Sequence, residues 1–106
     1  MDMSRAVDLV IVGMTGDAGA AAVHAARSGQ RVLVVDRTTD SRLTRRFRRS
    51  LHAADGVLER IVVLTGVEVV CVDGMHAVEA VLLRRLKTGR LIEFNARAVM
   101  MAGGAA

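Results

Sequence analysis

Hydrophobic residues in the first third of the chain form two short continuous runs separated by an alanine-rich segment. The runs predict buried strands at Asp8–Val12 and Arg31–Arg37, because consecutive Val, Leu and Ile residues bounded by a glycine or an acid are typical of such strands. The intervening residues Asp17–Ser28 predict a helix, and Gly29 stands at its C-terminal cap position. The order of strand, turn, helix and strand predicts a βαβ unit.

Apolar residues then recur at spacings of three and four between Leu43 and Ile61. This spacing predicts one helix, or two helices broken near Gly56. We expect Gly66 to end the helical region, and the run VEVVCV at 67–72 to form a third strand.

The last third of the chain contains three β-compatible runs, Val78–Leu86, Leu91–Asn95 and Ala98–Met101, with a glycine turn between the first two. We interpret them as a short antiparallel meander whose last strand returns to the parallel sheet. The pattern as a whole predicts an α/β, Rossmann-like three-layer fold with a parallel sheet and a small antiparallel β-meander, in a single domain at 1–106.

Composition adds three expectations. The 106 residues are 52% hydrophobic with two aromatics, both Phe, so an aliphatic core is expected. Cys71 has no cysteine partner and lies in an apolar run, which predicts a buried thiol in a reducing compartment. We expect no membrane span and a cytoplasmic location, because the N-terminal apolar run is short and interrupted by Asp8.

The positive charge is concentrated in one segment. Seven arginines stand against three acidic residues between Arg37 and Arg60, whereas charges in the rest of the chain balance. The run RLTRRFRRSL suggests a solvated basic helix face, with an acidic partner, a cofactor phosphate or nucleic acid as alternatives. Nucleic acid is the least favoured of these, because no aromatic residues are interleaved for base stacking.

The turn between the first strand and the first helix carries glycines at Gly13, Gly16 and Gly19. Glycines at such a turn let a pyrophosphate approach the backbone, and the helix N-terminus offers free N–H groups. Asp36 ends the second strand, where a carboxylate can accept hydrogen bonds from ribose hydroxyls. Together these residues predict an adenine dinucleotide, with NAD or FAD favoured over NADP because Asp36 repels a 2′-phosphate. The alternative is a packed βαβ unit without a ligand.

Two segments resemble the FAD-binding domain of FAD-dependent oxidoreductases. Asp8–Arg37 is similar to their N-terminal dinucleotide-binding segment, and Ala77–Ala106 is similar to the segment where a β-meander leads to an ARAVVLATGG-like strand and turn. The two segments occur in the right order and cover about 60 of the 106 residues. The likeness is greatest to the flavoprotein subunits of the succinate dehydrogenase and fumarate reductase class.

The resemblance implies a shortened FAD-binding domain or subunit of a flavin-dependent oxidoreductase, without its own substrate domain and completed by a protein partner or a homo-oligomer. It matches the three glycines to the pyrophosphate turn, Asp36 to the ribose ligand, and Gly103 and Gly104 to a second, flavin-contacting turn. The candidate cofactor-binding residues are Gly13, Met14, Thr15, Gly16, Asp17, Ala18, Gly19, Asp36, Arg37, Ala102, Gly103 and Gly104. No catalytic residue is assigned, and His24, His52, His76 and Cys71 have no metal-site spacing.

The sequence departs from the family pattern in three places. The first turn has one residue more than G-x-G-x-x-G, which makes Met14 or Thr15 the extra residue. Gly103 stands where the second turn usually has Thr, and only about 30 residues separate Arg37 from the third strand, too few for the family's substrate-binding portions.

The spacing G-x-x-G-x-x-G also resembles that of extended short-chain dehydrogenases and NAD-dependent epimerases. In that alternative, NAD is the cofactor, Asp73 contacts adenine, and the residues after Asp73 form a helix. The catalytic Tyr and Lys pair of that family is absent, because the chain contains no tyrosine.

Overall fold

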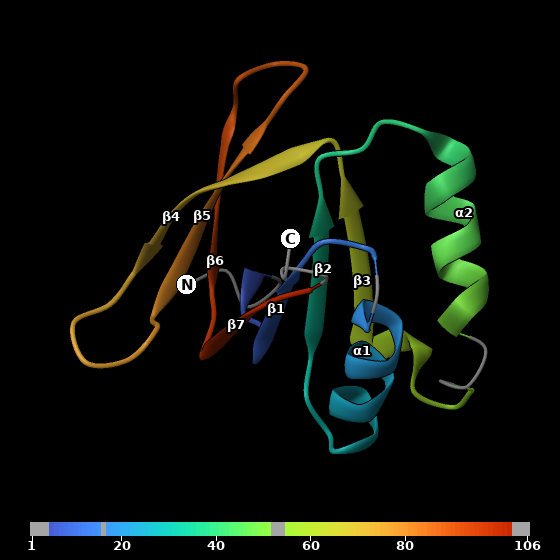
Figure 1. Cartoon of the computed structure of the whole chain (residues 1–106). Helices are drawn as coiled ribbons and strands as arrows, with labels where there is room; N and C mark the ends of the chain where they lie inside the picture. Colours follow the sequence, from blue (N-terminus) through green and yellow to red (C-terminus); the bar gives the residue numbers. More distant parts are fainter. Residues whose placement is uncertain (1–4, 16, 52–54, 103–106) are drawn as a thin grey trace.

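A parallel sheet forms the centre of the molecule. The computed structural model describes residues 5–15, 17–51 and 55–102. The sheet has the strand order β3-β2-β1-β7, with β1 at Leu9–Val12, β2 at Val32–Asp36, β3 at Ile61–Thr65 and β7 at Ala98–Met101 (Figure 1). All three pairings are parallel.

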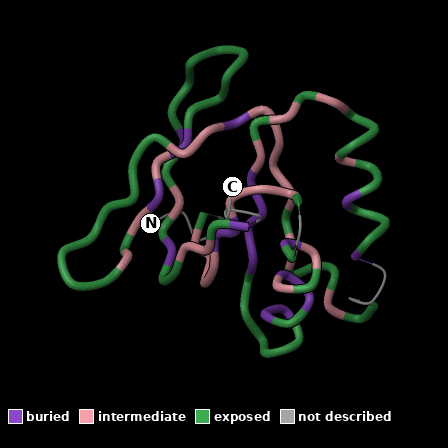
Figure 2. Tube along the Cα trace, viewed as in Figure 1, coloured by how far each residue is buried: buried purple, intermediate pink, exposed green. Residues whose placement is uncertain are grey.

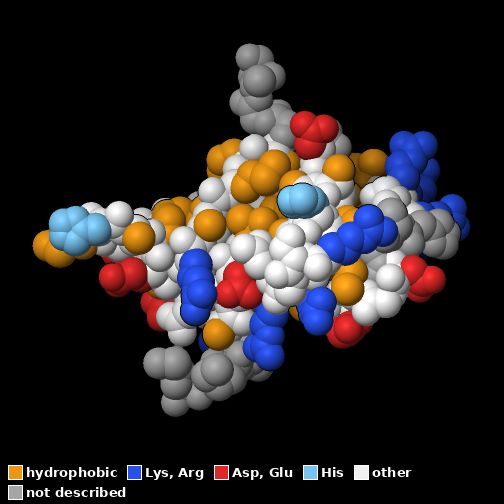
Figure 3. All heavy atoms as spheres, turned by 90° about the horizontal axis from the view of Figure 1, so that it is seen from below, with side chains coloured by type: hydrophobic (Ala, Val, Ile, Leu, Met, Phe, Trp, Pro, Cys, Tyr) orange, Lys and Arg blue, Asp and Glu red, His pale blue; other side chains and the backbone are white. Residues whose placement is uncertain are grey.

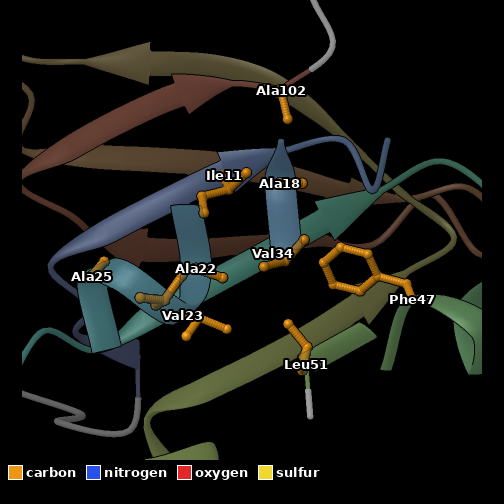
Figure 4. Packing of buried hydrophobic residues seen from close by; sticks show 10 residues of the cluster. Ile11, Ala18, Ala22, Val23, Ala25, Val34, Phe47, Leu51 and Ala102 are labelled. Atoms are coloured by element: carbon orange, nitrogen blue, oxygen red, sulfur yellow. The ribbon is translucent and has the colours of Figure 1, made fainter. Parts of the chain in front are cut away.

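Helices cover one face of this sheet. Helix α1 spans Ala18–Arg27, α2 spans Ser41–Ser50, and a 3-10 turn, η3, at Leu58–Arg60 leads into β3. The core on this side joins side chains of β1 and β2 to the alanine-rich face of α1 and to two residues from α2 and its C-terminal cap, Phe47 and Leu51. Figure 4 shows the Phe47 ring beside Val34 and Ala18.

An antiparallel meander covers the opposite face. Strands β4 (Val67–Asp73), β5 (Ala80–Arg85) and β6 (Leu91–Asn95) pair in that order, and β7 then returns to the parallel sheet beside β1. A second core cluster joins this meander to the sheet through Val10, Leu33, Val35, Val67, Val81, Leu83 and Ala96. The expected three-layer α/β architecture is therefore confirmed.

Strands β1 and β2 are buried on both faces, which explains their continuous apolar sequences. Ile11 and Val34 point into the helix-side core, whereas Val10 and Leu33 point into the meander-side core. All four side chains have no exposed surface. Figure 2 shows burial concentrated in these central strands and α1, with the hairpin tips exposed.

The structure corrects the expected helix between Leu43 and Ile61. Helix α2 ends at Ser50, and Ile61–Thr65 form β3, which pairs with β2 along its length. Four consecutive aliphatic residues, then Thr65 and Gly66, which has a positive φ of 67°, give a pattern close to that of β1, where the glycine follows the aliphatic run directly. The spacing of Leu58 and Ile61 continued the helical period and concealed this strand.

The expectation of a buried thiol is also wrong, because Cys71 is exposed. It lies in β4, one of the two edge strands of the meander, next to a register shift in the pairing with β5. Its neighbours in β4, Val70 and Val72, are 47% and 46% exposed, so this part of the edge strand is left uncovered. No described helix combines the length and apolar character needed to cross a bilayer.

Helix α1 lies against the C-terminal end of α2 at Gly19. A Cβ atom at this position would lie 3.1 Å from Ser50 Oγ, which is tighter than ordinary contact. Ser50 Oγ in turn donates a hydrogen bond to the Phe47 carbonyl. Gly19 therefore has a packing role between the two helices, independent of any ligand.

We predict that Gly19→Ala lowers the free energy of unfolding by about 0.5–1 kcal/mol, because Ser50 must move away from the new methyl group. In a Ser50→Ala background the same change should instead be neutral or stabilising by up to about 1 kcal/mol, since alanine has the higher helix propensity. Urea unfolding of the four proteins measures this coupling. An equal cost of Gly19→Ala in both backgrounds would contradict it.

The meander is tied to the end of β2 by a charged cluster around Glu68. Arg84 Nε donates to Glu68 Oε1 at 2.8 Å, and Arg84 Nη2 donates to the same oxygen. Arg37 Nη2 lies 3.8 Å from Glu68 Oε2. The hydrogen bonds from Arg84 and the charges of both arginines lower the pKa of Glu68 from its ordinary 4.5.

A lowered pKa means that ionised Glu68 stabilises the folded chain above about pH 4.5, and that this contribution is lost as the pH falls through the folded-state pKa. We predict that Glu68→Gln lowers the melting temperature at pH 7 and that its difference from the original chain shrinks in acid. Melting curves between neutral and acidic pH measure this, with Glu93→Gln on β6 as the matched control. A difference that stays constant into acid would contradict the prediction.

Candidate nucleotide-binding site

The candidate site lies where the direction of chain progression through the parallel sheet reverses. From β1 the chain moves outward to β2 and β3, whereas β7 lies on the other side of β1. Ligands of open α/β sheets bind outside the carboxyl ends of the strands at such a switch point. Gly13 follows β1 and Ala102 follows β7, so both residues lie at this point.

The backbone at Gly13 requires glycine. Its φ is +108°, and a Cβ atom would lie 3.2 Å from the carbonyl oxygen of Ala102. The Gly13 N–H donates to Val35 O at 2.7 Å, and the Ala102 N–H donates to Val12 O at 2.9 Å. The turns after β1 and β7 are thus in direct contact, although they are 89 positions apart in the numbering. Gly16, Gly103 and Gly104 lie outside the described residues.

The N-terminus of α1 faces this turn. Asp17 occupies the N-cap position, but its exposed side chain makes no capping hydrogen bond. The first-turn N–H groups of a helix have no partner one turn back and carry a partial positive charge. The Ala18 N–H donates to Thr15 O at 3.2 Å, and the Asp17 side chain makes no capping hydrogen bond to the N–H groups that follow, where an anionic group can bind.

Asp36 holds the turn through its side chain. Its Oδ2 accepts a hydrogen bond from Met14 N at 2.9 Å, and its Oδ1 accepts one from Thr38 N at 2.8 Å. Met14 is one of the two candidates for the extra residue in the glycine turn, so the longer turn is tied to the end of β2. A carboxylate has about four acceptor positions, so Asp36 retains capacity for ligand hydroxyls.

A pocket of about 460 Å³ lies between this turn and α2. It brings together four of the residues expected from the sequence, Met14, Thr15, Gly19 and Asp36. It also contains residues that sequence reasoning did not assign to the site: Ala20, Thr38, Leu43, Arg46, Phe47 and Ser50. The α2 members share one helix face, since they are separated by three, one and three positions. That spacing was visible in the sequence, but the orientation of the face toward the turn was not.

A second pocket, of about 360 Å³, opens on the meander side of the same sheet edge. Asp36 lines both pockets, whereas Arg37 lines only the second. The second pocket is lined by residues at the ends of β1, β2 and β7 and at the start of β4. These residues are Val12, Gly13, Val35, Asp36, Arg37, Val67, Glu68, Val69 and Met101. The carboxyl edge of the sheet is therefore hollowed on both sides of Asp36.

The structure does not contain the helix that the NAD-dependent epimerase alternative places after Asp73. Residues Ala80–Arg85 form strand β5 instead. Asp73 ends β4 in the antiparallel sheet, where its carbonyl accepts from Glu79 N at 2.8 Å. Burial alternates along β5 with the two-residue period of a strand that has one covered face and one open face. Among the described residues, no group of three or more His, Cys, Asp or Glu side chains is placed to hold a metal.

No protein-family model and no curated protein sequence matches the chain significantly. Solved structures match its fold. Thioredoxin reductase from Streptococcus pyogenes MGAS5005 matches with a TM-score of 0.67 and 22% identity, over 94% of this chain and 32% of the reductase. The amine oxidase HisD of 6-hydroxypseudooxynicotine from Pseudomonas geniculata N1 matches with a TM-score of 0.71 and 23% identity, over 94% and 15% of the two chains.

The myxobacterial chondrochloren halogenase CndH, a variant of the FAD-dependent halogenases, has a TM-score of 0.69 and 13% identity, over 96% of this chain and 38% of the halogenase. The chain therefore spans about a third of the thioredoxin reductase and halogenase chains. Likeness at this level of identity establishes the fold, a three-layer α/β domain that each of these larger enzymes also contains.

Proposed function

We propose that the chain binds FAD at the carboxyl edge of its parallel sheet, as the FAD-binding domain or subunit of a flavin-dependent oxidoreductase whose substrate-binding parts lie elsewhere. The observation that carries this proposal is the contact between Gly13 and Ala102 at the switch point, beside a pocket that contains Asp36. The likeness of fold to the FAD-dependent halogenase supports the choice of cofactor.

The residues present fit the parts of an adenine dinucleotide. Apolar side chains of Met14, Leu43 and Phe47 line the 460 Å³ pocket and suit an adenine ring. Asp36 and Thr38 supply oxygen atoms for ribose hydroxyls in the same pocket. The first-turn N–H groups of α1 suit the pyrophosphate, and the absent Cβ at Gly13 lets a ligand approach the backbone.

The contribution of this chain is to hold and orient the cofactor. Bound FAD supplies hydride and electron transfer, which belong to the flavin itself. Asp36 is held by two backbone N–H groups before any ligand arrives, so its carboxylate needs little reorganisation to accept a ribose hydroxyl. The hydrogen bond from Ala102 N to Val12 O likewise holds the ends of β1 and β7 together, and the bond from Gly13 N to Val35 O holds the turn against β2.

Two finer assignments remain within this proposal. The succinate dehydrogenase and fumarate reductase type rests on the sequence of the two terminal segments, whereas the structural matches are to thioredoxin reductases, an amine oxidase and a halogenase. NAD is the competing cofactor, favoured by the spacing of the glycine turn alone. The candidate residues Gly16, Gly103 and Gly104 retain their proposed roles in the two turns.

We predict that FAD raises the melting temperature of the purified chain more than NAD does. A ligand at about 100 times its dissociation constant adds about 2.7 kcal/mol, which corresponds to roughly 10 °C or more for a domain of this size. Flavin absorbance that remains with the protein after gel filtration provides a second readout. A chain that is stabilised by NAD and not by FAD, or by neither, would contradict FAD binding.

Two tryptophan variants on α1 test the position of the site. Ala20 is exposed and lines the pocket, whereas His24 is exposed one turn later on the same helix and does not line it. We predict that Ala20→Trp weakens FAD binding by about tenfold or more, because the indole occupies the pocket, and that His24→Trp leaves binding unchanged. Fluorescence titration with FAD measures both variants. Equal affinity in the two would place the cofactor elsewhere.

A further inference from the structure

Helix α2 presents three different faces. Phe47 packs into the helix-side core, and Leu43, Phe47 and Ser50 line the pocket described above. The third face carries Arg42, Arg45 and Arg49, together with Arg46, which lies at the border with the pocket and lines that pocket as well. All four arginines are exposed, and they form a stripe about 10 Å long. Figure 3 shows Lys and Arg side chains at the end of the molecule where α2 lies.

These four arginines surround a groove on the outer surface. The groove has a volume of about 420 Å³ and is lined by Asp40, Leu43 and the four arginines. Arg42 lies 3.6 Å from Asp40, which caps the same helix by accepting a hydrogen bond from Arg42 N. Among the described residues, Arg45, Arg46 and Arg49 have no carboxylate within ion-pair distance. The groove therefore holds several cations whose charges the described part of the chain does not balance.

The identity of the cations indicates the chemistry of a ligand. All four are arginines, whose planar guanidinium groups bind carboxylates or phosphates through two parallel hydrogen bonds. Arg48, on another face of the helix, is directed to the Val63 carbonyl at 3.5 Å and does not line the groove. The four arginines of the groove are thus separate from Arg48, which contacts β3.

An apolar side chain within the groove favours an acidic protein over a nucleic acid as the ligand of the arginines. Leu43 is 48% exposed and is surrounded by arginines. A phosphate backbone offers nothing for this side chain to pack against, whereas an amphipathic protein segment does. Neither phenylalanine can stack on bases from this face, because Phe47 is buried and Phe94 belongs to the meander-side cluster.

We propose that this face of α2 is a docking surface for an acidic amphipathic helix of a partner protein. Carboxylates spaced three or four residues apart on the partner meet the arginine stripe, and an apolar side chain of the partner covers Leu43. The surface overlaps the proposed cofactor site at Leu43 and Arg46, whereas Arg42, Arg45 and Arg49 lie outside that site. Docking is therefore expected in the absence of FAD, through arginines that the cofactor site does not use.

The probe is a fluorescent helix-forming peptide of about 16 residues, long enough to be helical, with glutamates on one face and leucines beside them. A matched peptide carries glutamines in place of the glutamates, and a short DNA duplex is the third probe. Fluorescence anisotropy is measured at about 50 mM and about 300 mM salt, because screening weakens exposed charge pairs. We expect the glutamate peptide to bind more tightly than the other two probes and to weaken with salt.

Two triple variants separate the surface from general electrostatics. Arg42→Glu, Arg45→Glu and Arg49→Glu together reverse the stripe but leave Arg46, which lines the cofactor pocket. Arg85→Glu, Lys87→Glu and Arg90→Glu together make the same change of charge on the exposed β5–β6 hairpin. We expect the first variant to weaken peptide binding by about tenfold or more and the second to change it little.

Leu43→Ser should weaken peptide binding at both salt concentrations, because it removes an apolar contact and not a charge. Tighter binding of DNA, equal loss in the two triple variants, or no binding of the glutamate peptide at low salt would each overturn the proposal. The stabilising effect of FAD on the first triple variant is measured in parallel. That effect should persist, so failure of docking and failure of cofactor binding give different results.

Discussion

The burial of β1 and β2 on both faces determines where everything else lies. Each strand carries alternate side chains into two separate cores, so helices must cover one face and the meander the other. With both faces covered, the ends of the strands are left for contact with a ligand. The carboxyl ends are hollowed, and the glycine turn, Asp36 and the turn after β7 meet there.

The sequence was sufficient to predict the local units but not their contacts. The βαβ unit and the return of β7 to the sheet follow from continuous apolar runs and glycine turns, which are local signals. Strand β3 was missed because Leu58 and Ile61 extend a helical period. The contribution of α2 to the pocket depends on how the helix packs on the sheet through Phe47. No local sequence pattern specifies that packing.

Asp36 illustrates how a residue can be located correctly while its surroundings differ from expectation. Its position at the end of β2 follows from the apolar run that it terminates. Its two oxygen atoms, however, already accept N–H groups from Met14 and Thr38. The bond from Met14 joins residues 22 positions apart, whereas the bond from Thr38 joins residues two positions apart. Only the second can be predicted from local turn patterns. The same carboxylate thus supports the fold and faces the proposed ligand.

The hydrogen bond from Met14 to Asp36 also bears on how such turns change during evolution. A one-residue insertion in a strand-to-helix turn leaves an additional backbone N–H that needs an acceptor. Here Asp36, the acid at the end of the neighbouring strand, accepts the N–H of Met14. The length of this glycine turn is therefore tied to the acid that ends the neighbouring strand, because that acid supplies the acceptor for a backbone N–H of the turn.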